Sequence, residues 1–406
     1  MDLGDNVWTV GQLLEGLQRG DDVFVLDVRN RDEFERFRVE GRGPLPALNV
    51  PYFEMLEAGG HEDMVDAIAA CVERDLADRL PRDRPIVTVC AKGNTAVFVT
   101  EGLRRLGYPG VTLAGGMTAW GGHYSTRAVV ERADLAIHQV SRPARGCLSY
   151  VVASGGRATV IDPTRHLHPY VELARARGLS IERVIDTHGH ADHVSGGPAL
   201  ARETGATYHL HPYDAVHPLD LMPATIRYEP IRDGEIFPVG RHRLQALHAP
   251  GHTLGLTALR LDPYLFTGDS IFIRSIARPD LGGRAEAWAP LHARSLRALA
   301  ALPGDTVVLP GHFSSLEEAQ ADGVFAAPLA LLKRTNDGLV ALAGATDADF
   351  VRYLLESLPE PIAEYADIKR VNAGLLTATE EDAARLELGK NVCALAQAYA
   401  PANGGT

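Results

Sequence analysis

Hydrophobic and polar positions alternate in short blocks along the first third of the chain. Three short, mostly apolar runs, typical of buried strands, lie at residues 23–26, 86–89 and 111–113. Around these runs apolar residues recur at helical spacing, which predicts helices over residues 12–17, 65–80 and 95–106. Strands that alternate with helices are typical of a mostly parallel sheet covered on both faces. The pattern therefore predicts a separate α/β domain over residues 1–125.

The middle of the chain carries short, largely apolar runs that each lead into a polar residue near a glycine. These runs lie at residues 181–185, 244–247, 264–267 and 307–309. Helical patterns follow at residues 329–333, 350–358 and 383–400, which predicts a helical extension over residues 326–406. Residues 126–134 lack clear periodicity and are expected to be a linker. With 406 residues the chain exceeds what one core usually supports, so two domains are expected.

Charge and composition narrow the classes of partner. A formal net charge of −12 argues against nucleic acid or an acidic membrane surface as a partner. No stretch reaches the ~18 apolar residues that a membrane helix needs, and residues 1–20 are charged without an apolar block. The four cysteines are widely separated and show no metal-type spacing: Cys71, Cys90, Cys147 and Cys393. A reducing cytoplasm is therefore the expected compartment.

A cluster of metal-ligand side chains follows the apolar run 181–185. Within seven residues the chain places His188, His190, Asp192 and His193, a density that ordinary core hydrogen bonds cannot satisfy. A divalent cation, in contrast, requires several imidazoles and carboxylates that converge on one point. The ends of the three later runs supply further candidates beside glycines, which permit close backbone approach: His252, Asp269 and His312. The sequence therefore predicts a metal site built from several strand ends.

These residues resemble the ligand set of the metallo-β-lactamase superfamily, over roughly residues 135–325. The resemblance implies an α+β domain, an αββα sandwich with the metal site at one edge of its two sheets. The resemblance assigns His188, His190 and His252 to a first metal position and Asp269 to a bridging position. It assigns Asp192, His193 and His312 to a second position. Upstream, Asp162 either orients a ligand or forms a plain Asp-Pro turn.

Cys90 follows the run 86–89 and precedes a predicted helix. A thiolate at this place would face backbone N–H groups and the positive end of the helix, with Lys92 adding charge. The alternative is a small apolar side chain packed at a strand end. The sequence around Cys90 leaves both interpretations open.

Residues 8–122 resemble the rhodanese family. The matching pieces are residues 26–29 with Glu33, residues 89–90 with Gly93, and residues 113–117 with Trp120. The resemblance implies sulfur transfer, with Cys90 carrying a sulfane sulfur as a persulfide. Rhodanese loops commonly carry arginine at their second and fifth positions, where this chain has Ala91 and Asn94. Lys92 is therefore the only cation that the loop itself offers to an anionic substrate.

Within the metallo-β-lactamase superfamily, residues 266–281 and 146–150 look like those of the persulfide dioxygenases. That resemblance implies one Fe(II) per chain, held by His188, His252 and Asp269, and leaves His190, Asp192, His193 and His312 without a second ion. The implied reaction oxidises a glutathione-type persulfide with O₂ to sulfite and the thiol. Arg278 matches an arginine near the family's site and is expected to bind substrate. Arg274 is a weaker candidate for the same role.

Two other functions stay open. The complete set of ligand residues also fits a thioester hydrolase of the hydroxyacylglutathione hydrolase type, with two Zn(II) per chain that generate hydroxide near neutral pH. A third interpretation is a sulfur-sensing or docking protein with an inactive rhodanese unit. The expected partners are a low-molecular-weight thiol persulfide, O₂ and a sulfane-sulfur donor, with no nucleic acid and no membrane. The C-terminal helices are expected to pack on the sandwich or to form a homodimer contact.

Overall fold

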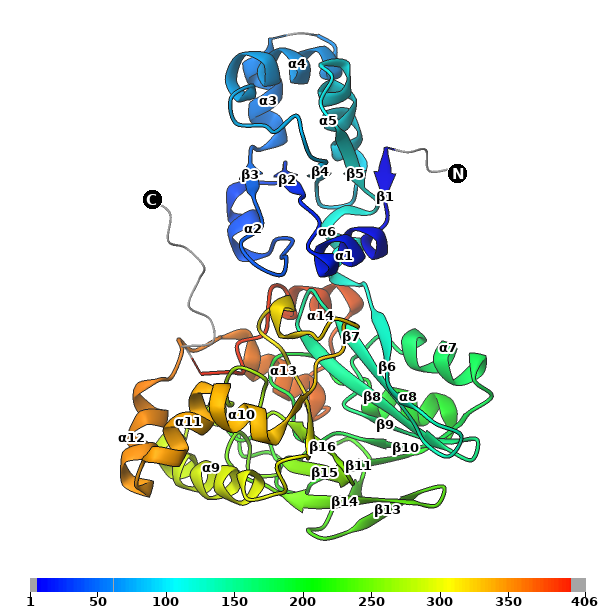
Figure 1. Ribbon diagram of the computed structural model, residues 1–406, viewed down its shortest axis with the longest axis vertical. Coiled ribbons are helices and arrows are strands. Elements are labelled where there is room, and N and C mark those ends of the chain that lie inside the picture. Colours follow the sequence, from blue (N-terminus) through cyan, green and yellow to red (C-terminus); the bar gives the residue numbers. More distant parts are fainter. Residues whose placement is uncertain (1–5, 61, 396–406) are drawn as a thin grey trace.

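The computed structural model describes residues 6–60 and 62–395 and shows two packed domains (Figure 1). The N-terminal domain has a parallel five-stranded sheet in the order β1-β5-β4-β2-β3. Its strands are β1 (Val7–Trp8), β2 (Phe24–Asp27), β3 (Ala47–Asn49), β4 (Ile86–Val89) and β5 (Gly110–Leu113). Its helices are α1 (Val10–Arg19), α2 (Arg31–Arg36), α3 (Tyr52–Gly59), α4 (Met64–Cys71), α5 (Asn94–Arg105) and α6 (Gly116–Gly121). The predicted α/β domain is confirmed, and the helix predicted over 65–80 divides into α4 and a π-helical turn, Val72–Leu76.

The second domain begins with a seven-stranded sheet in the order β12-β11-β10-β9-β8-β7-β6. Its strands are β6 (Ser125–Glu131), β7 (Ala136–Arg142), β8 (Cys147–Ser154), β9 (Arg157–Ile161), β10 (Ser180–Ile185), β11 (Thr207–Leu210) and β12 (Glu229–Pro230). The predicted linker 126–134 is wrong, because most of it forms β6, which pairs antiparallel with β7 at the sheet edge. Side chains of β6 alternate between exposed and half-buried, a pattern of strands covered on one face.

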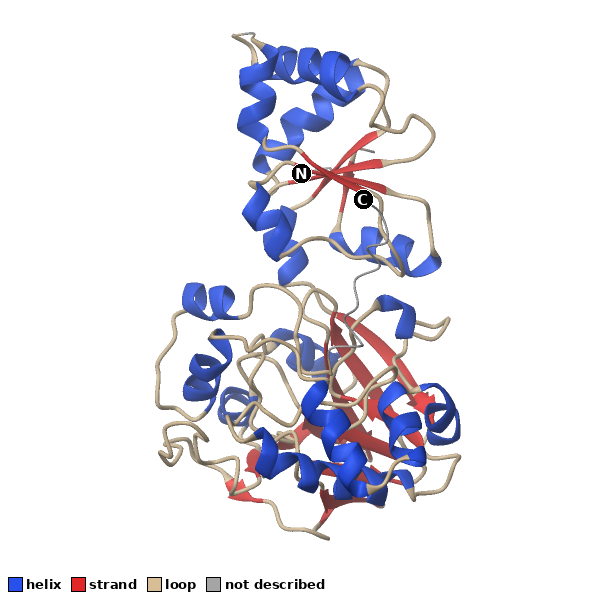
Figure 2. Cartoon of the chain, turned by 90° about the vertical axis from the view of Figure 1, so that its left-hand side faces the viewer, coloured by secondary structure: helices blue, strands red, loops and turns tan. Residues whose placement is uncertain are grey.

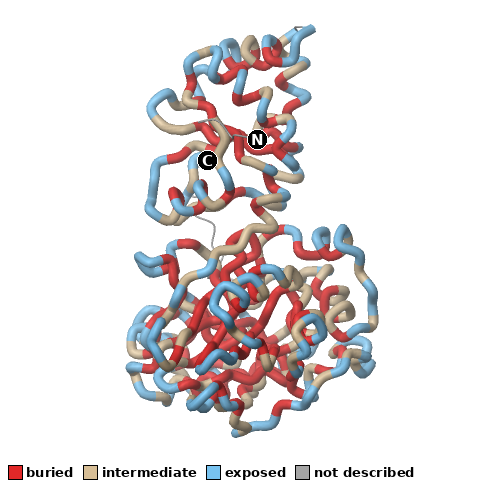
Figure 3. The backbone as a smooth tube through the Cα atoms, turned by 90° about the vertical axis from the view of Figure 1, so that its right-hand side faces the viewer, coloured by how far each residue is buried: buried red, intermediate tan, exposed pale blue. Residues whose placement is uncertain are grey.

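A six-stranded sheet in the order β13-β14-β15-β16-β17-β18 packs against the first one. Its strands are β13 (Ile236–Val239), β14 (His242–His248), β15 (Thr257–Leu261), β16 (Tyr264–Gly268), β17 (Val307–Pro310) and β18 (Ala327–Pro328). Apolar side chains from both sheets meet in one core, to which Tyr150 and Phe266 contribute an edge-to-face pair with ring centroids 5.0 Å apart. Buried segments concentrate in these sheets (Figure 3).

Helices cover both outer faces of the sandwich (Figure 2). On the first sheet lie α7 (His168–Ala176) and α8 (Gly197–Thr204), and on the second lie α9 (Ala285–Ala300), α10 (Leu329–Thr335), α11 (Asp337–Gly344) and α12 (Asp347–Glu356). The predicted αββα sandwich with C-terminal helices is therefore confirmed. Among the described residues, no helix is long and apolar enough to cross a membrane.

The last part of the chain runs back over the edge of the sandwich that faces the N-terminal domain. It forms α13 (Glu364–Asn372) and α14 (Glu380–Leu386). The helix predicted over 383–400 is confirmed for residues 383–386, which belong to α14, and wrong for residues 387–395, which are not helical and in which Gly389 has φ +87°. Residues 396–400 lie outside the described residues.

The two domains share buried apolar contacts and ion pairs. Side chains of α1 and α6, such as Leu14 and Trp120, belong to the same apolar cluster as the sandwich core. Lys390 pairs with Glu40 at 3.2 Å, and Arg36 pairs with Glu364 at 2.9 Å. The N-terminal domain therefore packs directly on the C-terminal segment.

Candidate functional site

Four strand ends deliver the predicted ligands to one place between the two sheets. The loop after β10 carries His188, the loop between β14 and β15 carries His252, and the residue after β16 is Asp269. His312 follows β17. Gly268 at the end of β16 has φ +49°, and a Cβ there would lie 2.4 Å from Oγ1 of Thr187, so a glycine is needed for this approach.

Three buried ligand atoms converge without any hydrogen-bond partner. Nε2 of His188 lies 3.8 Å and Nε2 of His252 lies 3.5 Å from Oδ2 of Asp269. None of these three atoms has a hydrogen bond within the described chain, although the side chains are at most 1% exposed. Unsatisfied buried polar atoms cost free energy, and a cation at their centre removes that cost. Two neutral imidazoles and one carboxylate therefore fit a divalent metal ion.

Hydrogen bonds behind these side chains fix the direction of their ligand atoms. Nδ1 of His252 donates to the main-chain oxygen of Arg278 at 2.8 Å, so Nε2 is the nitrogen left free. Nδ1 of His188 lies 3.0 Å from Oγ1 of Thr187, whose hydroxyl donates to Asp162 at 2.8 Å. Asp162 also accepts the Thr187 N–H at 2.6 Å. It therefore orients a ligand through Thr187, one of the two roles open from sequence.

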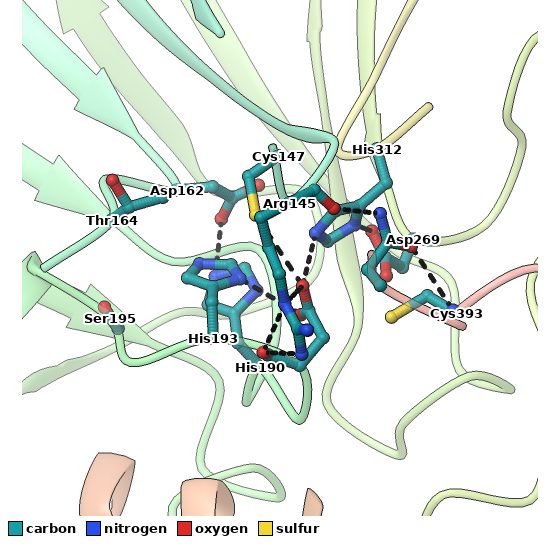
Figure 4. A network of polar contacts seen from close by, with 12 residues as sticks. Arg145, Cys147, Asp162, Thr164, His190, His193, Ser195, Asp269, His312 and Cys393 are labelled. Atoms are coloured by element: carbon teal, nitrogen blue, oxygen red, sulfur yellow. Dashed lines mark hydrogen bonds and ion pairs between the residues drawn. The ribbon is translucent and has the colours of Figure 1, made fainter. Parts of the chain in front are cut away.

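The other four ligand positions form ion pairs with carboxylates or lie beside them (Figure 4). His312 bridges two carboxylates, with Nδ1 2.6 Å from Oδ1 of Asp269 and Nε2 2.9 Å from Oδ2 of Asp192. Nδ1 of His193 lies 3.0 Å from Oδ1 of Asp192. His190 faces Asp162 at 3.3 Å and Asp186 at 3.7 Å. Its ligand atoms group with these two carboxylates and not with His188 and His252.

The pKa values of the histidines fall into two groups, one lowered and one raised. Burial, helped by the neighbouring histidines, holds the pKa of His188 well below its usual value, and burial also lowers the pKa of His252. Burial opposes protonation of His190, but the carboxylates of Asp162 and Asp186 raise its pKa well above the usual value. Neutral imidazoles are the form that binds metals. Without a metal, His188 and His252 are therefore neutral, whereas His190 is paired with carboxylates.

A cavity of about 260 Å³ opens beside the convergent ligands. Its wall combines apolar and cationic side chains, among them His188, Leu221, Arg284, Trp288 and Lys369. Lys369 on α13 is 8% exposed, and its ammonium donates to the main-chain oxygen of Gly189 at 3.1 Å. Burial lowers the pKa of this lysine. The sequence pattern did not mark Lys369, because it lies on a helix far along the chain from the histidine motif.

The two arginines that are predicted to contact substrate do not line this cavity. The buried guanidinium of Arg278 donates to both carboxylate oxygens of Asp280 and to three main-chain oxygens, those of Glu360, Val392 and Pro359. All five N–H groups are thus used within the protein, which differs from the predicted role. Arg274 pairs with Glu317 at 2.5 Å on the surface.

Two cysteines lie close to the ligands, which the sequence did not indicate. Sγ of Cys147 lies 3.7 Å from Oδ2 of Asp192, within a group that also holds His193 and His312. Cys393 groups with Asp269 and His312, from the C-terminal segment (Figure 4). All four cysteines are free and buried. Cys147 and Cys393 lie far from the histidine motif in the sequence, so no local spacing predicted that they would lie near the ligands.

Cys90 lies at the end of β4, directly before α5. It is 4% exposed, and its Sγ accepts the Gly93 N–H at 3.1 Å. Ala91 and Lys92 are exposed on the same loop. The sulfur thus meets a backbone donor before a helix and also packs in an apolar cluster, so features of both interpretations that the sequence left open are present.

Two protein-family models match the chain, one in each domain. Residues 142–312 match the family model of the metallo-beta-lactamase superfamily, and residues 9–123 match that of the rhodanese-like domain. The chain thus joins a rhodanese-like domain to a domain of the metallo-beta-lactamase superfamily.

The curated relatives match about two fifths of the chain. A hydroxyacylglutathione hydrolase of Polaromonas sp. is 34% identical over 170 residues, covering 40% of this chain and 61% of the relative. One of Cereibacter sphaeroides is 32% identical over 181 residues, covering 44% of this chain and 64% of the relative. The chain thus spans about three fifths of the length of the curated relatives that it matches.

Two solved structures are similar. A metallo-beta-lactamase from Staphylococcus aureus subsp. aureus COL has 27% identity and a TM-score of 0.52, covering 61% of this chain and 74% of that one. ETHE1 from Myxococcus xanthus has 25% identity and a TM-score of 0.48, covering 62% of this chain and 100% of that one.

Proposed function

We propose that the metal-site domain is a persulfide dioxygenase with one Fe(II) per chain. It oxidises a glutathione-type persulfide with O₂ to sulfite and the thiol. The rhodanese-like domain carries a sulfane sulfur on Cys90 and exchanges it with a donor and the thiol carrier.

The observation that carries the proposal is the separation of the ligand positions. His188, His252 and Asp269 bring their ligand atoms to one point. The ligand atoms of His190, which likewise make no hydrogen bond, group with two carboxylates instead. Two histidines and one carboxylate on one face of a metal, with open positions opposite, are typical of non-haem Fe(II) oxygenases. When bound, Fe(II) supplies the redox chemistry for the addition of O₂ to the persulfide sulfur.

The protein's own side chains prepare the reaction by positioning and by excluding water. Complete burial of the three ligands removes competing solvent. The ammonium of Lys369 lies in the cavity wall and attracts an anionic persulfide or the carboxylates of its carrier. Leu221 and Trp288 give the same cavity an apolar wall for the carrier chain.

A two-zinc thioester hydrolase is the second candidate. The relatives named hydroxyacylglutathione hydrolase support it, and Cys147, Asp192, His193 and His312 offer a second donor group. The grouping of His190 argues against it: its ring lies 4.2 Å from that of His188 between centroids, but its ligand atoms group with Asp162 and Asp186 and not with those of His188 and His252. The third interpretation, a sulfur-sensing protein, requires that Cys90 form no persulfide.

Metal analysis combined with two assays tests the proposal. Protein purified without added metal is expected to hold close to one iron per chain, to consume O₂ with glutathione persulfide, and to leave thioesters intact. Two zinc ions per chain, with thioester hydrolysis and no O₂ uptake, would contradict it. Persulfide formation on Cys90 after incubation with thiosulfate, followed by mass spectrometry, tests the rhodanese-like domain.

A further inference from the structure

The loop of Cys90 borders a cavity that lies between the two domains. Ala91, the residue next to Cys90, lines this space, which has a volume of about 440 Å³. Ala91 occupies the loop position where related loops commonly carry arginine. An arginine at position 91 would therefore extend into the cavity. The missing cation leaves the sulfur-transfer loop incomplete on this side.

The opposite wall of the cavity supplies arginines from the metal-site domain. Arg142 ends β7, and Arg165 follows β9. Together with Arg145 they face the rhodanese-like residues Ala91 and Thr118 across the cavity. Arg142 also reaches the other domain, because its Nε donates to the main-chain oxygen of Gly121 in α6 at 2.9 Å. The cations absent from the loop are thus present across the domain boundary.

Two of these guanidinium groups keep a donor for a ligand. Arg142 and Arg165 share one buried carboxylate oxygen of Glu387, at 2.6 and 2.8 Å. Arg165 also pairs with the exposed Glu380 at the rim. Nη2 of Arg142 and Nη2 of Arg165 make no hydrogen bond within the described residues. Glu387 and Glu380 balance the charge of these two arginines, so what the arginines offer to the oxygens of an anion is their two free Nη2 donors.

Arg29 and Arg145 have fewer hydrogen-bond donors left for a ligand in the cavity. Arg29 forms a bidentate pair with buried Asp27 and also donates to the main-chain oxygen of Phe37. Arg145 donates to the main-chain oxygens of Asp192 and Gly389. The free donors of the cavity therefore belong to Arg142 and Arg165.

We propose that this interdomain cavity is the anion subsite of sulfur transfer, completed by Arg142 and Arg165 of the metal-site domain. Its ligand is a small sulfur oxyanion of the thiosulfate class. The inference rests on the proposed role of Cys90 as the sulfur carrier.

The reaction in this subsite balances without any further reagent. The Cys90 thiolate attacks the outer sulfur of thiosulfate, the S–S bond breaks, and sulfite leaves with the electron pair. A thiolate of the carrier then attacks the outer sulfur of the Cys90 persulfide, which releases the Cys90 thiolate. The arginines stabilise the oxyanion in both the bound donor and the departing sulfite.

The test compares sulfur transfer from thiosulfate to glutathione in variants of the full chain. Arg165→Ala removes one charged donor and should raise the KM for thiosulfate about tenfold, the loss of one charge-assisted hydrogen bond. Ala91→Arg in the Arg165→Ala background should restore much of the affinity, because it returns the cation from the loop side. Arg36→Ala removes an interdomain ion pair outside the cavity and serves as the matched control.

Three outcomes would overturn the inference. The first is an unchanged KM in folded Arg165→Ala. The second is an equal rise in Arg36→Ala, which would indicate a loosened interface. The third is a failure of Ala91→Arg to lower the KM for thiosulfate. This failure counts both in the Arg165→Ala variant and in the otherwise natural protein. If Cys90→Ser keeps full transfer, the proposed carrier role itself fails, and that result is distinct from a failure of the subsite alone.

Discussion

Nδ1 of His252, a candidate metal ligand, donates to the main-chain oxygen of Arg278 at 2.8 Å. The N–H of Arg278 in turn donates to the main-chain oxygen of Cys393 at 2.9 Å. Its guanidinium is held by Asp280 and by three main-chain oxygens. The orientation of His252 therefore depends on a segment more than a hundred residues later in the chain.

The first prediction concerns Arg278→Ala. The substitution leaves Asp280 and several main-chain oxygens without a donor, and removal of one partner of a buried pair costs about 3–5 kcal/mol of folding stability. We expect a lower melting temperature and a lower metal content, because His252 loses its fixed support. Thermal unfolding and metal analysis measure both quantities. A normal melting temperature and metal content, with only a raised KM for persulfide, would instead restore the predicted substrate role of Arg278.

Sequence patterns predicted the elements and the ligands better than the supports behind them. The histidine motif and the later strand ends predicted a group of candidate ligands, because ligand residues beside glycines at strand ends follow local rules. The resemblance to the persulfide dioxygenases, and not the pattern, singled out His188, His252 and Asp269. Arg278 and Lys369 depend on how helices and the C-terminal segment pack over the site. Such packing has no spacing rule in the sequence, so their contacts could not be foreseen.

The second prediction contrasts two residues that touch each other. Asp269→Ala removes a ligand and its compensating charge, so iron content should fall from near one per chain to near zero. His312→Ala removes the imidazole that pairs with Oδ1 of Asp269 and with Asp192, and loss of such a partner costs roughly 10–100-fold in metal affinity. Iron should still bind at high concentration. Equal loss in both variants, with two metals in the natural protein, would support the two-zinc alternative.

The third prediction concerns Lys369→Met. The ammonium is buried beside the cavity, and its loss should raise the KM for glutathione persulfide about tenfold while metal content stays unchanged. Folding stability should not fall, because burial of a lysine charge is itself costly. Arg274→Ala, which affects a surface ion pair, is the matched control and should change neither quantity. Kinetics identical to the natural protein would exclude Lys369 from substrate binding.

The fourth prediction concerns acid stability. Burial opposes ionisation of Glu387, but Arg142 and Arg165 outweigh it and lower its pKa to about 2, from a usual value of 4.5. This depressed pKa contributes about 3 kcal/mol to the free energy of unfolding above pH 4.5, and the contribution disappears as the pH falls towards 2. Urea unfolding between pH 7 and pH 3 measures it. In Glu387→Gln this part of the pH dependence should be absent, and an identical pH dependence in both proteins would contradict the assignment.

The linker and the C-terminal helix show where pattern reading failed. Residues 126–134 have no clear periodicity, yet β6 forms there because the edge of β7 offers hydrogen bonds to any extended neighbour. Residues 387–395 contain many apolar side chains, but their main chain bonds to Arg145 and Arg278 instead of forming a helix. In both cases tertiary contacts decided the local structure.

The last prediction concerns the separation of the two reactions. Leu14 and Trp120 pack in the same apolar cluster as the sandwich core, so large deletions would damage both domains. A single atom exchange avoids this problem. Cys90→Ser keeps the shape of the loop, but serine is a far poorer sulfur nucleophile than cysteine at neutral pH. Transfer between thiosulfate and glutathione should therefore vanish, and O₂ uptake driven by that pair should vanish with it. Direct oxidation of supplied glutathione persulfide should continue at nearly the natural rate.

Paired O₂-uptake assays on the natural protein and on Cys90→Ser measure both rates. If direct oxidation also collapses while iron content is unchanged, Cys90 takes part in the oxidation step and the two domains do not act as separate stations.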